Sequence, residues 1–173
     1  MAVHILTECY MDTLLMETIV PPVKGYNHQH SCNKVLSTMK NKLNNEFAIG
    51  IIDDDKVVPK DLNDFEYVKT YHKTIKLYKH RSRPHYVIKI VPAVEQFILN
   101  DANRSAISLA TYNLPSDVKL FTKITKHNTS KNHKDLKNLL TALKQNNSQG
   151  IFQLTQLVEH LKANPYNPQF DLL

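Results

Sequence analysis

The sequence predicts an α/β domain with a mostly parallel sheet of four strands, flanked by helices and followed by a helical C-terminal extension. Strand-like apolar runs alternate with helical patterns in the first part of the chain, as expected when helices connect parallel strands. Residues 47–52 form an almost continuous apolar run, which is typical of a strand buried on both faces. The apolar content of 42% in 173 residues is enough for one core, so a single domain is expected over 1–173.

The first strand is expected over 3–8, and the helix after it opens at Asp12. The prolines at 21–22 end that helix, because proline cannot continue a helical hydrogen-bond ladder. The same prolines place the short strand expected over 23–28 at an edge of the sheet.

A second helix begins at Ser31 or Asn33, because either side chain can cap a helix N-terminus. It ends at the asparagine pair 44–45, and the central strand over 47–52 follows. Beyond that strand lies a polar connection over 57–83 that is rich in lysine. It is expected to be either a solvated helix or loop, or a functional segment.

The fourth strand is expected over 86–91, and Pro92 leads from it into a helix through Phe97. These elements complete an α/β core over 1–102. Residues 103–173 are expected to be mainly helical, because two leucine-rich amphipathic stripes lie there at helical spacing.

Carboxylates follow the expected strands at the points where the strands end. Glu8 ends the first strand, while Asp53 and Asp55 end the third. Asp12 opens the first helix and Glu95 follows the fourth strand, so topology places these two at the same edge of a parallel sheet. Strands lie about 5 Å apart, so acids at neighbouring strand ends can share one cation. Carboxylate oxygens suit hard divalent cations, and the sequence therefore predicts a Mg²⁺ or Mn²⁺ site.

Residues 53–55 are three consecutive aspartates. Such close acids repel one another, which raises their pKa values unless a cation compensates. Asp53 and Asp55 point the same way if the chain stays extended, and Asp54 points elsewhere. An acidic, solvated turn is the alternative interpretation of these three residues taken alone.

The order strand–Glu–x–x–x–Asp, followed by an apolar strand ending in Asp-x-Asp, resembles the Toprim fold of topoisomerases, primases and OLD-family nucleases. Residues 5–12 and 49–55 carry the resemblance, and residues 91–95 are similar to the strand and Pro-x-x-Glu segment of OLD-like proteins. The resemblance implies that Glu8 acts as a general acid/base or metal ligand and that the Asp-x-Asp pair binds Mg²⁺. The family usually has glycine after the glutamate, and this chain has Cys9.

Such a site suits phosphodiester chemistry, because cations held by carboxylates can activate a water and stabilise a leaving oxygen. Lys56 follows the acids directly and is a candidate catalytic residue that neutralises transition-state charge. The 57–83 segment combines cations with tyrosines, which is the composition of a nucleic-acid contact. Its expected nucleic-acid-binding residues are Lys73, Lys76, Lys79, Arg81 and Arg83.

Several other function classes are excluded or disfavoured. The chain has only three glycines, Gly25, Gly50 and Gly150, and they form neither a GxxxxGK(S/T) phosphate-binding loop nor a GxGxxG dinucleotide turn. His28, His30 and Cys32 invite a zinc interpretation, but no second pair of ligands follows at a matching spacing. Two cysteines form no disulfide framework, and no apolar stretch reaches the length of a membrane span, so a cytoplasmic protein without a membrane partner is expected.

Two functional hypotheses follow. The first is a metal-dependent nuclease acting on DNA or RNA, such as the effector of a bacterial stress or antiviral defence system. The second is a non-catalytic Toprim-like module that binds nucleic acid or a partner ATPase. The complete Glu and Asp-x-Asp pattern favours the first, and Cys9 keeps the second open.

Overall fold

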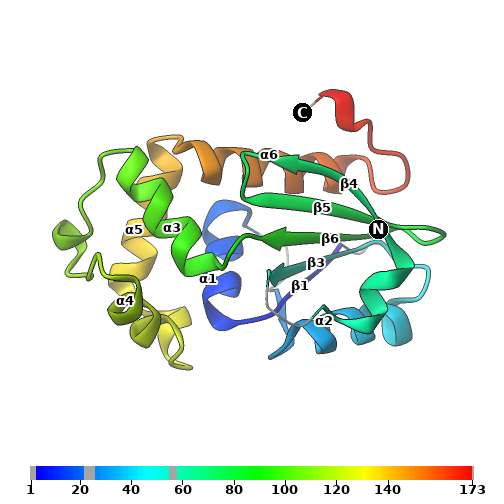
Figure 1. The fold of residues 1–173 in the computed structure, drawn as a ribbon, viewed down its shortest axis with the longest axis horizontal. Helices are drawn as coiled ribbons and strands as arrows, with labels where there is room; N and C mark the ends of the chain where they lie inside the picture. The colour runs from blue at the N-terminus through cyan, green and yellow to red at the C-terminus, as the bar shows by residue number, and fades with distance from the viewer. Residues whose placement is uncertain (1–2, 22–25, 55–57, 173) are drawn as a thin grey trace.

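The computed structural model describes residues 3–21, 26–54 and 58–172 and contains a mixed six-stranded sheet flanked by helices (Figure 1). The strand order is β2-β1-β3-β6-β5-β4. The strands are β1 (His4–Thr7), β2 (Asn27–His28), β3 (Ala48–Asp53), β4 (Phe65–Tyr71), β5 (Ile75–His80) and β6 (His85–Ile90).

The parallel part of the sheet confirms the expected α/β order. β1 pairs with β3, and β3 pairs with β6, all in parallel. The short β2 lies at the edge beside β1, as the prolines before it predicted. The ends of the first, third and fourth expected strands therefore lie at one edge of the sheet.

The prediction of four strands was wrong, because part of the 57–83 segment forms an antiparallel hairpin. β4 pairs with β5, and β5 pairs with β6. Ile75 and Leu77 alternate with Lys76 and bury one face of β5, but the many lysines and tyrosines hide this period of two in the sequence. The turn at His72 and Lys73 has positive φ at both residues (49° and 61°), the pattern of a tight hairpin turn.

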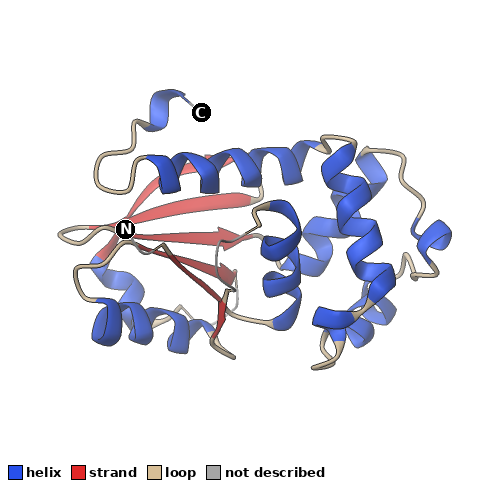
Figure 2. Ribbon diagram, turned by 180° about the vertical axis from the view of Figure 1, so that it is seen from behind, coloured by secondary structure: helices blue, strands red, loops and turns tan. Residues whose placement is uncertain are grey.

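Helices cover both faces of the sheet (Figure 2). The α2 side packs against Leu6, Ala48 and Val87, while the larger cluster on the other face includes residues of α1, α3, α4, α5 and α6. Ser31 caps α2 through a hydrogen bond from Lys34 N–H, as predicted. The helices are α1 (Tyr10–Ile19), α2 (Cys32–Thr38), α3 (Val94–Arg104), α4 (Val118–Thr125), α5 (Lys134–Gln145) and α6 (Gln149–Ala163).

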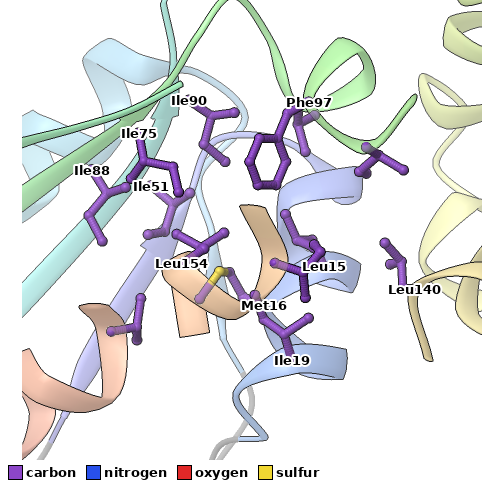
Figure 3. Close-up of a cluster of buried hydrophobic side chains, with 14 of the residues drawn as sticks. Leu15, Met16, Ile19, Ile51, Ile75, Ile88, Ile90, Phe97, Leu140 and Leu154 are labelled. Carbon is purple, nitrogen blue, oxygen red and sulfur yellow. The ribbon is translucent and has the colours of Figure 1, made fainter. Parts of the chain in front are cut away.

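The larger core joins the sheet to the C-terminal helices (Figure 3). Leu15 of α1, Ile51 of β3, Leu140 of α5 and Leu154 of α6 belong to one buried cluster. The helical extension thus packs on the α/β core and holds the starts of α1 and α3 near the strand ends. No helix in the described ranges is long and apolar enough to cross a membrane.

Gly50 allows α2 and the π-helical turn after it to approach the centre of β3. A Cβ atom at this position would lie 2.8 Å from Val35 Cγ1 and 2.9 Å from Met39 Sδ. We expect Gly50→Ala to lower the free energy of unfolding by about 1–2 kcal/mol, because overpacking forces these side chains to shift. Urea unfolding monitored by circular dichroism measures this change, and a stability equal to wild type would contradict the close packing.

Candidate functional site at the carboxyl edge of the sheet

Four of the predicted carboxylates come together at the carboxyl edge: Glu8, Asp12, Asp53 and Glu95. Glu8 follows β1, and its Oε2 accepts a hydrogen bond from the backbone N–H of Asp53, 3.1 Å away. Asp12 lies in the first turn of α1 and Glu95 in the first turn of α3. Negative charge on each of the other three raises the pKa of Asp53, which shows that the four acids share one electrostatic environment.

Burial and mutual repulsion make two of these acids weak. Burial, followed by the charges of Asp12, Glu95 and Glu8, raises the pKa of Asp53 to about 9. Burial and the neighbouring charges of Glu8 and Glu95 raise the pKa of Asp12 to about 7, although hydrogen bonds from Cys9 act in the opposite direction. At neutral pH the cluster therefore holds protons, and a cation would replace them.

Hydrogen bonds fix the orientation of three of the carboxylates. Asp53 Oδ1 accepts from Val94 N–H (2.9 Å), at the start of α3. Asp12 Oδ2 accepts from Cys9 N–H (3.0 Å), and Glu95 Oε1 accepts from the Thr125 hydroxyl of α4 (2.6 Å). The other oxygen of Asp12, Oδ1, is buried and has no hydrogen-bond partner in the described structure. Buried carboxylate oxygens normally accept a hydrogen bond, so this oxygen is open to a donor or a cation.

The donor atoms suit a hard cation, but no finished cage is present. Within 3–21, 26–54 and 58–172, no three His, Cys, Asp or Glu side chains are arranged to hold a metal ion. All four carboxylates use one oxygen for the hydrogen bonds above. Two predicted site residues, Asp55 and Lys56, lie outside the described residues.

Cys9 follows Glu8 directly and has no backbone strain. Its φ of −125° and ψ of 171° are extended, a conformation open to any residue. Its Sγ accepts a hydrogen bond from Asp12 N–H, so Cys9 and Asp12 form a capping box at the start of α1. Burial, and then the charge of Asp12, raises the pKa of the Cys9 thiol well above its ordinary value. The thiol therefore caps the start of α1.

The sequence analysis missed Lys89 and the role of Asp54. Asp54 points to the opposite face from Asp53, as predicted, and pairs there with Lys89 of β6 and with Lys76 of β5, 3.1 Å away. Burial alone would raise the pKa of Asp54, but the hydrogen bonds and charges of the two lysines outweigh it and lower that pKa. A single lysine inside the apolar run of β6 was the signal available in the sequence.

The predicted nucleic-acid-binding residues do not form one surface. Lys73 in the hairpin turn and Lys76 lie toward the carboxyl edge of the sheet, because Ile75 pairs with Ile90 at that end, but Lys76 pairs with Asp54 on the face opposite Asp53. Lys79 pairs with Tyr86 near the start of β6, so it and the two arginines lie toward the other end of the sheet. The strand rise places the two groups about 15–20 Å apart.

The arginines themselves have protein partners. Arg81 pairs with Glu66 (3.1 Å), and Arg83 donates to the carbonyl oxygen of Lys40 (2.9 Å). The split arrangement arises from the hairpin, which the sequence analysis did not predict. Of the five residues, Lys73 and Lys76 lie toward the carboxyl edge of the sheet, and Lys76 is held there by its ion pair with Asp54.

Comparisons of the chain with protein-family models, with curated proteins and with solved structures found no match. The functional argument is therefore based on the site itself.

Proposed function

We propose that the protein is a Toprim-like nuclease that hydrolyses phosphodiester bonds of DNA or RNA with Mg²⁺ or Mn²⁺. The observation that carries the proposal is the buried carboxylate edge, in which Asp53 has a raised pKa and Asp12 Oδ1 has no hydrogen-bond partner within the described residues. A divalent cation would relieve both features at once, because it compensates the mutual repulsion and gives Asp12 a positive neighbour.

In this proposal Glu8, Asp12 and Asp53 would hold the cation once their side chains turn toward it, because they are not arranged for a metal ion in the described structure. Asp55, outside the described residues, belongs to the same proposed set. When bound, such a cation activates water and stabilises charge on phosphate oxygens. In this proposal Lys56 supplies positive charge for the phosphate. A role in bacterial stress or antiviral defence, with or without a partner ATPase, is part of the same proposal.

Cleavage of supercoiled plasmid, single-stranded DNA and RNA with Mg²⁺ or Mn²⁺ tests the proposal. Wild type is expected to cut at least one of these substrates, and EDTA is expected to stop cleavage. Asp53→Asn is the control variant, because the amide oxygen can still accept the Val94 hydrogen bond but carries no charge. Equal cleavage by this variant, or metal-independent cleavage, would contradict the proposal.

A specific observation supports a second candidate, a non-catalytic module that binds nucleic acid or a partner. Cys9 and Asp12 cap α1 reciprocally, and Asp53 connects β3 to the start of α3, so these acids already have a structural role. Isothermal titration with Mg²⁺ and Mn²⁺ separates the two candidates. Absence of metal binding by wild type, together with retained binding of nucleic acid, would favour the module.

A further inference from the structure

Three aromatic rings form a cluster beside the carboxylate edge. Tyr10, the first residue of α1, stacks on His28 at the end of β2, with ring centroids 4.1 Å apart and planes inclined by 29°. His30 stands edge-on to both rings, with centroids 4.1 Å from His28 and 6.0 Å from Tyr10. Tyr10 and His28 are half-buried and His30 is exposed, so the cluster meets solvent.

The backbone holds this cluster next to Glu8. His28 pairs with Thr7 in the parallel ladder of β1 and β2, and Gln29 N–H donates to the Thr7 carbonyl at 2.9 Å. Tyr10 lies between Glu8 and Asp12 in the chain. The three rings therefore lie at the same edge of the sheet as the carboxylates.

His30 has an unusual backbone conformation for this position. Its φ of 70° lies in the left-handed region, which side-chain-bearing residues adopt rarely and at some cost in energy. The exposed imidazole packs edge-on against His28.

We propose that Tyr10, His28 and His30 form a stacking site for an unpaired base, and that the substrate of the carboxylate edge is single-stranded nucleic acid. The inference rests on the proposed function for its choice of ligand. Aromatic rings bind bases through their faces and accept any base, but in a duplex those faces are covered by neighbouring base pairs. The cluster consequently selects single strands over duplexes without reading sequence.

Binding of fluorescent oligonucleotides in EDTA tests this inference independently of cleavage. Wild type is expected to bind a single-stranded mixed-sequence oligonucleotide more tightly than the matching duplex. Base stacking contributes about 1–3 kcal/mol, so Tyr10→Ala is expected to weaken single-strand binding by about 5- to 150-fold. Tyr10→Phe keeps the ring and is expected to bind like wild type.

Two further variants keep the test clear of folding effects. His30→Gly removes the exposed ring and also relieves the positive φ, so it is expected to fold at least as stably as wild type and still bind single strands less tightly. Tyr67→Ala removes an exposed tyrosine on β4, distant from the cluster in the sheet order, and is expected to leave binding unchanged.

The outcomes for the two proposals are separable. Equal affinity for single strand and duplex, unchanged binding by folded Tyr10→Ala and His30→Gly, or a loss confined to Tyr67→Ala would overturn the stacking site. Cluster-dependent binding of single strands by a protein that cuts nothing would support the stacking site and overturn the nuclease. Cleavage of a duplex, together with nucleic-acid affinity that the cluster variants leave unchanged, would support the nuclease and overturn the stacking site.

Discussion

Raising the pH from 6.5 to 8.5 in EDTA is expected to lower the free energy of unfolding by about 2–3 kcal/mol, with Asp53 as the main cause. The folded pKa of Asp53 is about 9, against an ordinary value of 3.8. In this pH window the folded state keeps the proton that the unfolded state has lost. Stability therefore falls by up to about 1.4 kcal/mol per pH unit for each such group.

Between pH 6.5 and 8.5 the other titratable groups change the free energy of unfolding less than Asp53 does. Asp12, with a folded pKa of about 7, acts in the same direction but only at the lower end. Burial lowers the pKa of His85 to about 4, which makes stability rise with pH, but only up to the ordinary histidine value of 6.5. The Cys9 thiol adds a further loss of stability only near its ordinary value of 9.0.

Urea unfolding at the two pH values, with and without Mg²⁺, measures the effect. Asp53→Asn is expected to lose most of the pH dependence and to be more stable than wild type at pH 8.5 in EDTA. Mg²⁺ is expected to stabilise wild type more at pH 8.5 than at pH 6.5, since the cation competes with protons. A flat profile for wild type would show that the acids are not held close together.

The parallel half of the fold could be predicted because its signals are local. The apolar run of β3 requires burial on both faces, and Ser31 and the early prolines mark where α2 begins and α1 ends. The hairpin could not be predicted in the same way. Its inner face is apolar only at alternate positions, and Lys76 and Tyr78 on the other face give it the composition of a solvated segment.

The same reasoning explains which site residues were predicted. Glu8 follows β1, Asp53 ends β3 and Glu95 lies in the first turn of the helix after β6, so topology alone places them at one edge. The partners of Asp54 could not be deduced, because Lys76 belongs to a strand that sequence patterning did not reveal. The separation of Lys76 from Arg81 follows from the same strand. Once the segment is extended, side chains only a few residues apart in the sequence lie toward opposite ends of the sheet.

Replacing Asp54 by alanine is expected to lower the free energy of unfolding by about 3 kcal/mol at pH 7. Lys89 is 5% exposed, and Asp54 is its ion-pair partner in the described structure. Removing one member of a buried ion pair leaves the other charge in a medium that solvates it poorly. Lys76→Ala, by contrast, removes a more exposed partner and leaves the Asp54–Lys89 pair in place, so a loss below about 1 kcal/mol is expected.

Asp54→Ala can destabilise the protein by leaving the Lys89 charge unpaired or by removing packing. A double-mutant cycle with Lys89→Met separates these two effects. Methionine fills similar space without a charge, so Lys89→Met alone is expected to change stability by less than about 1.5 kcal/mol. In that background Asp54→Ala is expected to cost far less than in wild type, because no buried ammonium remains to be left unpaired. Urea unfolding of the four proteins measures the coupling. Additive losses of stability would show that Asp54 acts by packing. Strong coupling means that lysines of β5 and β6 hold Asp54 electrostatically. Because Asp53 is the next residue in the chain, this ion pairing also fixes the direction of its side chain.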